Sequence, residues 1–169
     1  QFVIAIILAR LLTPAQYGVV GIITIFITIA NVVVQSGFST ALVQKQKADK
    51  VDFSSVCYFD LFVALVMYGI LYAAAPVIAS FYGIAELEAI VRVLSIVLFP
   101  GAVISVQTAY VSRNLEFKGL FLSTLAASAA SGVISIWMAA NGFGVWAMVG
   151  QQVSYYFVLM IALFFEVSW

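Results

Sequence analysis

Four polar side chains recur at helical spacing in a segment that is otherwise apolar. Thr24, Thr28, Asn31 and Gln35 are spaced by four, three and four residues, which places them on one face of a helix. Such a stripe either packs against a neighbouring helix or lines a water-filled cavity. Asn31 and Gln35 carry amides that are costly to bury, so a cavity competes with helix packing here, and both residues are candidates for substrate binding.

A second group of amides lies further along the sequence. Gln151 and Gln152 each stand four residues before a tyrosine, Tyr155 and Tyr156 respectively. Amides and phenols can hydrogen-bond to sugar hydroxyls, and they can equally bond one helix to another. Both glutamines are therefore candidate substrate-binding residues, with helix packing as the alternative.

A stripe of hydroxyl residues has a more structural character. Thr124, Ser128, Ser131 and Ser135 share one helix face and are surrounded by Ala and Gly. Small residues let helices approach closely, and hydroxyls can bond across the contact. This stripe predicts a helix-packing face.

Asp60 and Arg92 are charged residues that fall clearly inside apolar segments, where a charge is a candidate for function. Arg92 either extends outward to lipid headgroups or faces a central cavity and binds an anionic substrate. Three roles are open to Asp60: to extend toward the nearer membrane surface, to bond a neighbouring helix, or to bind a coupling proton or cation. The two residues are separated by on the order of 15 Å along the membrane normal, so no direct ion pair is expected.

The sequence lacks the residue types that most catalytic and metal sites need. It contains no His and one Cys, Cys57, which excludes a Ser-His-Asp set, a Cys-based zinc site and an internal disulfide. No Gly-rich loop carries the Lys-Ser or Lys-Thr pair of a phosphate-binding loop, and no basic face exists for nucleic acid. We expect no enzyme activity, no cofactor, no metal and no nucleic-acid partner.

The elements that position these residues follow from composition. The sequence is 65% hydrophobic and 8% charged, whereas soluble domains average about 45–50% apolar and about 25% charged. From Gly119 to Phe165 no residue is charged. As a single helix this run would extend about 70 Å, against about 30 Å for the core of a bilayer. It therefore predicts two membrane spans joined by a turn at Asn141-Gly142-Phe143-Gly144.

Continuous apolar runs of this length favour an all-α, polytopic membrane helix bundle over a β-barrel. We expect a single helical lobe over residues 1–169, with about six spans of which the first is truncated: about 1–12, 17–40, 53–80, 89–111, 119–140 and 144–165. Thr13 and Pro14 are expected to begin the second helix. Pro100-Gly101 is expected to bend the fourth span.

Basic residues gather in the loops on one side of this predicted bundle: Lys45, Lys47, Lys50, Arg113 and Lys118. Arg10 is the one basic residue near the loops of the other side. Because loops rich in Lys and Arg stay cytoplasmic, loops 44–52 and 113–118 are predicted to face the cytoplasm. Membrane lipids are the surrounding partners.

Six segments, read in order, resemble the polysaccharide and O-antigen flippases of the multidrug/oligosaccharidyl-lipid/polysaccharide exporter superfamily. The segments are ARLLTPAQYG at 9–18, SGFSTALVQK at 36–45, APVIASFYG at 75–83, RVLS at 92–95, RNLEFK at 113–118 and GFGVWA at 142–147. The resemblance implies a bacterial inner-membrane transporter with two six-helix lobes around a central cavity. This chain would be most of the first lobe of that two-lobe transporter.

The resemblance also implies a function, the translocation of a polyprenyl pyrophosphate-linked oligosaccharide to the periplasmic leaflet by alternating access. Arg92 would then attract the pyrophosphate, while Asn31, Gln35, Gln151 and Gln152 meet the sugars. A polysaccharide polymerase or synthase is a further candidate partner. Two alternatives stay open: a cation-coupled drug exporter of the same superfamily, with Asp60 as the coupling group, and a structural membrane subunit of a polysaccharide synthesis complex.

Overall fold

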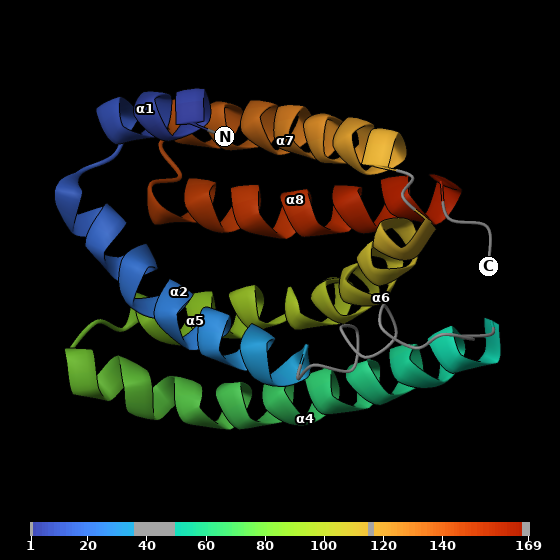
Figure 1. The fold of residues 1–169 in the computed structure, drawn as a ribbon. Helices are drawn as coiled ribbons and strands as arrows, with labels where there is room; N and C mark the ends of the chain where they lie inside the picture. Colours follow the sequence, from blue (N-terminus) through green and yellow to red (C-terminus); the bar gives the residue numbers. More distant parts are fainter. Residues whose placement is uncertain (1, 36–49, 115–116, 167–169) are drawn as a thin grey trace.

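The computed structural model describes residues 2–35, 50–114 and 117–166, and within these ranges every regular element is an α-helix (Figure 1). The predicted loop residues Lys45 and Lys47, and positions 115–116 of the second basic loop, lie outside the described residues. The helices are α1 (Phe2–Leu11), α2 (Pro14–Val34), α4 (Lys50–Tyr82), α5 (Glu86–Ser95), α6 (Leu98–Asn114), α7 (Phe117–Ala140) and α8 (Val145–Glu166).

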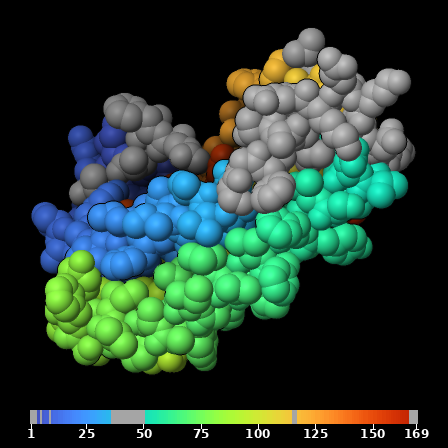
Figure 2. Space-filling view, turned by 60° about the horizontal axis from the view of Figure 1, so that its bottom comes forward, coloured from blue at the N-terminus to red at the C-terminus, as the bar shows by residue number. Residues whose placement is uncertain are grey.

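Five stretches of the described chain are long and apolar enough to cross a membrane: 14–34, 51–82, 86–114, 117–140 and 145–165. Large apolar side chains on their outer faces are exposed, among them Ile25, Phe62 and Trp137. Figure 2 shows one such outer face, where α4 lies beside α2. Apolar faces of this extent are unfavourable in water and suit contact with lipid chains. The prediction of an all-α, polytopic membrane helix bundle is confirmed.

The bundle has two parts, which contact each other directly through α6 and α8 and which α2 also bridges (Figure 1). The hairpin of α7 and α8, with α1 lying along α7, forms one part, and α4 packed against α5 and α6 forms the other. α2 crosses between them and contacts α4, α5, α6 and α8. The largest buried apolar cluster joins α2, α4 and α5 through side chains such as Ile23, Ala75 and Leu94.

The turns α1–α2, α4–α5 and α7–α8 lie together at one end of the molecule, at the left of Figure 1. Thr13 is the N-cap of α2 and Pro14 its first residue, as predicted, and the Thr13 backbone N–H donates to the Gln16 side chain at 2.9 Å. Gly142 and Gly144 turn the chain between α7 and α8 at positive φ, 79° and 55°. Other residues adopt this backbone region only at a cost, which explains the glycines in the predicted turn.

The apolar stretch 86–114, which corresponds to the predicted fourth span, is interrupted at Ile96-Val97, between α5 and α6. Pro100 lies one turn later and has no backbone N–H to give to the carbonyl of Ile96. That carbonyl instead accepts the N–H of Phe99 at 3.2 Å, a tighter turn than the α-helix. The regular pattern resumes at Gly101, whose N–H donates to Val97 at 2.9 Å. The predicted loosening near Pro100-Gly101 is thus present, one turn before the proline.

Candidate functional site

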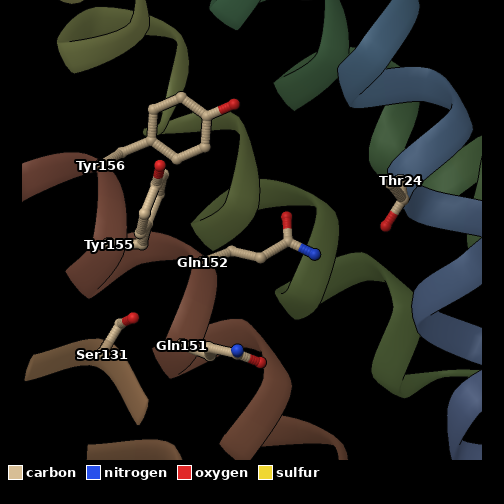
Figure 3. Close-up of a pocket in the computed structure, with 6 residues that line it drawn as sticks. All are labelled: Thr24, Ser131, Gln151, Gln152, Tyr155 and Tyr156. Carbon is tan, nitrogen blue, oxygen red and sulfur yellow. The ribbon is translucent and has the colours of Figure 1, made fainter. Parts of the chain in front are cut away.

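A polar cavity of about 320 Å³ lies between α2, α7 and α8 (Figure 3). Its volume falls at the lower end of the range typical of ligand pockets. Among the described residues, six side chains line it, and none of the six is charged: Thr24, Ser131, Gln151, Gln152, Tyr155 and Tyr156. The cavity therefore brings together members of all three polar groups that the sequence singled out, in a bundle whose other surfaces are mainly apolar.

Four of the six lining residues come from two successive turns of α8. Gln151 and Gln152 lie one turn before Tyr155 and Tyr156, so each amide has a phenol above it on the same helix. The two tyrosine rings meet edge to face, with centroids 5.7 Å apart. This contact holds the phenols in place beside the amides, and in Figure 3 the Gln152 side chain extends from α8 toward α2.

The hydroxyls from α2 and α7 already donate to their own helices. Thr24 Oγ1 donates to the Val20 carbonyl at 2.7 Å, and Ser131 Oγ donates to the Ser128 carbonyl at 3.2 Å. Each hydroxyl oxygen keeps lone pairs that can accept a hydrogen bond from a ligand. Within the described residues, the amides of Gln151 and Gln152 form no hydrogen bond, so donors and acceptors of both are available to a ligand.

Asn31 lies next to the cavity rather than in its lining. Its Oδ1 atom is buried without a hydrogen-bond partner, and a Cβ added to Gly101 would stand 2.9 Å from it. The same Cβ position is 3.8 Å from the ring of Tyr156, which does line the cavity. Gln35 caps the C-terminal end of α2, where its side chain is exposed, and it is not among the lining residues.

Arg92 is half-buried on α5 and packs against α4, and it is not among the described residues that line the polar cavity. Its Nη2 atom lies 2.8 Å from Glu88 Oε1, one helical turn away. Its guanidinium carbon lies 4.4 Å from the centre of the Tyr72 ring on α4. The charge is thus shared between a carboxylate and an aromatic face, both near the α4–α5 turn.

Asp60 is fully buried on α4, and the exposed residues Tyr58 and Phe62 lie on the opposite side of the helix. A second buried polar residue, Gln107 on α6, was not singled out from the sequence. Its signal was present, since it is a lone amide within the predicted span 89–111.

Ser131 and Ser135 on the serine-rich face of α7 are buried. Within the described residues, the hydroxyls of Thr124, Ser131 and Ser135 on this face donate to carbonyls of α7 itself rather than across a helix contact. Ser135 donates to the carbonyl of Gly132 on the same helix, at 3.0 Å. A Cβ on Gly132 would lie 2.5 Å from Cδ1 of Ile4, so the absence of a side chain lets α1 approach α7. Close backbone approach, not hydroxyl bonding, accounts for this helix contact.

Comparison with known proteins places the chain among proteins of polysaccharide synthesis. The sequence profile of a family described as polysaccharide biosynthesis protein matches residues 7–169. The succinoglycan biosynthesis transport protein ExoT of Rhizobium meliloti (strain 1021) is 26% identical over 151 residues. The teichuronic acid biosynthesis protein TuaB of Bacillus subtilis (strain 168) is 34% identical over 92 residues.

These relatives are much longer than the present chain. The ExoT match covers 89% of this chain and 31% of that protein, and the TuaB match covers 54% of this chain and 19% of that protein. No solved structure matches the chain.

Proposed function

This chain belongs to the polysaccharide biosynthesis protein family, and on that basis we propose that it is one lobe of a membrane transporter for a lipid-linked oligosaccharide. The transporter would move its substrate across the bacterial inner membrane during polysaccharide export. One relative is named as a transport protein and another as a protein of teichuronic acid synthesis, which supports a glycan substrate.

The observation that carries the proposal is the uncharged polar cavity. Polar side chains inside membrane spans are costly unless they have partners, so six of them around one cavity need an explanation. Amide, phenol and hydroxyl groups supply both donors and acceptors, which a sugar with many hydroxyls can use. A cavity without charge suits the sugar portion of the substrate rather than its pyrophosphate.

The cavity therefore receives the sugars, and Gln151 and Gln152 are their principal hydrogen-bonding partners in this proposal. Asn31 does not line the cavity, but both its Oδ1 atom and the ring of Tyr156 lie within 4 Å of the position that a Cβ on Gly101 would take. Arg92 takes no part in the sugar contact, because its guanidinium is engaged with Glu88 and Tyr72.

Matched substitutions on α2 test this proposal. Thr24→Val and Thr28→Val make the same isosteric change one helical turn apart, but Thr24 lines the cavity and Thr28 is exposed outside it. Each variant is expressed in a strain that lacks the transporter, and its surface polysaccharide is measured relative to the amount of protein in the membrane. We expect Thr24→Val to reduce export about fivefold, which corresponds to one hydrogen bond of about 1 kcal/mol, and Thr28→Val to have no effect.

The result that would contradict the proposal is equal export by the two variants. Full export by a triple variant that carries Thr24→Val, Gln151→Leu and Gln152→Leu would favour a structural membrane subunit. In such a subunit the polar side chains serve only to pack helices together. If the Thr24→Val variant loses drug resistance while the amount of surface polysaccharide is unchanged, the result would favour a drug exporter.

A further inference from the structure

Asp60 is buried in a way that an ionised carboxylate does not tolerate. Its exposed fraction is 0%, and neither carboxyl oxygen has a hydrogen-bond partner among the residues that the structure describes. A charge enclosed without a partner is so unfavourable that the group instead takes up a proton or holds a cation. The extended conformation toward the membrane surface, which was one open interpretation, is therefore not the one observed.

Gln107 on α6 is likewise a fully buried polar residue, and its side-chain atoms have no hydrogen-bond partner among the described residues. Its exposed fraction is also 0%, and the atoms without a partner are Nε2 and Oε1. Unpaired polar atoms on two buried side chains are rare in a folded protein, and each such group requires an explanation.

The packing of α4 against α6 places these two residues at nearly the same level. Two ring contacts define the antiparallel register: Phe53 with Tyr110 at 5.4 Å, and Tyr68 with Phe99 at 5.5 Å. Asp60 lies midway between Phe53 and Tyr68 along α4. On α6, the midpoint between Tyr110 and Phe99 is near positions 104–105, so Asp60 has about the same height along the helix axes as these positions. Gln107 is less than one helical turn from that level.

We propose that Asp60 and Gln107 form a buried proton-binding site between α4 and α6. When the carboxyl carries its proton, the O–H donates to Gln107 Oε1, and the Gln107 Nε2–H donates to the other carboxyl oxygen. Small rotations of the two side chains bring these groups together and satisfy the unpaired atoms. This site is separate from the polar cavity and does not depend on the sugar-binding role proposed above.

The ligand is a proton rather than a metal ion. Hard metal cations require about six oxygen ligands, whereas a proton needs one donor–acceptor pair. Within the described residues, no group of three or more His, Cys, Asp or Glu side chains could hold a metal. One carboxyl and one amide match the requirement of a proton.

The surroundings offer Asp60 no obvious countercharge within the described chain. The titratable or charged groups on the helices packed around it are Cys57, Tyr58 and Asp52 on α4, Tyr110 and Arg113 on α6, and Glu88 and Arg92 on α5, which pair with each other. Asp52 and Arg113 have interactions of their own. Release of the proton therefore requires α4 and α6 to separate enough to admit water, which links protonation to the packing of these two helices.

Infrared spectroscopy of the purified protein in lipid bilayers tests the site directly. A protonated carboxyl gives a C=O stretching band that a carboxylate lacks. We expect this band in the wild-type protein at neutral pH and its loss in Asp60→Asn, which keeps the shape of the neutral acid. Asp52→Asn, at the first turn of α4, is the matched control and should leave the band in place.

Gln107→Leu provides a second measurement in which the carboxyl itself is retained. The band should persist and shift toward the frequency of a carboxyl without a hydrogen-bond partner. The proposal is overturned if Asp60→Asn removes no protonated-carboxyl band at neutral pH, or if Gln107→Leu leaves the band unshifted. It is overturned equally if Na⁺ at constant pH abolishes the band, since the site would then take a metal cation.

Discussion

Gln151 and Gln152 differ from the hydroxyl residues beside them in what their hydrogen-bonding groups already do. Thr24 and Ser131 give their protons to carbonyls of their own helices, whereas the two amides make no hydrogen bond within the described chain. An amide in an apolar span without a partner is costly, and a ligand with hydroxyl groups removes that cost. We therefore propose that ligand binding at the cavity depends most on these two amides.

At the same scale, the two partners of Arg92, Glu88 and Tyr72, determine how much stability the protein should lose when Arg92 is replaced. A salt bridge within a helix and a cation–π contact near the surface together contribute about 1 kcal/mol. Arg92→Gln is accordingly expected to lower stability by about 1 kcal/mol or less, measured by thermal unfolding in detergent, and to leave polysaccharide export unchanged. Loss of export in a stable Arg92→Gln protein would return Arg92 to the substrate-binding residues.

At the scale of elements, the sequence was most informative about where helices begin, end and bend. Thr13 and Pro14 begin α2, and glycines at 142 and 144 turn the chain before α8, because each of these residue types has a strong backbone preference. Pro100 predicted the position of the irregularity in the fourth predicted span to within one helical turn. Nothing local, however, determines how a helix is rotated about its axis, because tertiary packing sets that rotation.

That rotation explains which candidate residues came together. Asn31 and Gln35 were predicted on the same stripe, but the stripe meets the cavity only at Thr24, and Gln35 at the end of α2 is exposed. Gln107 was missed because a single amide has no periodic pattern that would mark it. Its significance appears only through its level relative to Asp60 in the packed pair of helices.

The break between α5 and α6 can be tested as a hinge that transport requires. Pro100→Ala restores an N–H that can bond the Ile96 carbonyl, so we expect a straighter helix, unchanged or higher thermal stability, and reduced export because a hinge is lost. Pro76→Ala is the control, since Pro76 is exposed within the uninterrupted helix α4. Export by Pro100→Ala equal to that of Pro76→Ala would show that the break is not needed for transport.

At the scale of the whole molecule, three turns, α1–α2, α4–α5 and α7–α8, form one group at the same end (Figure 1). The contact between Gln16 and Gly144 joins two turns of the same group, where a Cβ on Gly144 would lie 2.7 Å from the Gln16 amide nitrogen. Arg113 and Lys118 belong to the other end. The basic residues predict that this second end faces the cytoplasm.

Cysteine labelling tests that orientation. In a Cys57→Ala background, Asn141→Cys should react with a membrane-impermeant thiol reagent added to intact cells, after removal of the outer membrane where there is one. Lys118→Cys should react only after the inner membrane is opened. Both positions are exposed, so accessibility within the fold does not limit either reaction. Labelling of Lys118→Cys from outside, with Asn141→Cys protected, would invert the orientation.

Transport by the purified full-length protein in lipid vesicles tests the central claim most directly. The movement of a lipid-linked oligosaccharide between leaflets is compared for the wild type and for Gln151→Leu/Gln152→Leu, with folding checked by thermal unfolding. Two lost hydrogen bonds of about 1 kcal/mol each predict a rate about 30-fold lower for the double variant. Equal rates for the two proteins would contradict the assignment of the polar cavity as the sugar-binding site.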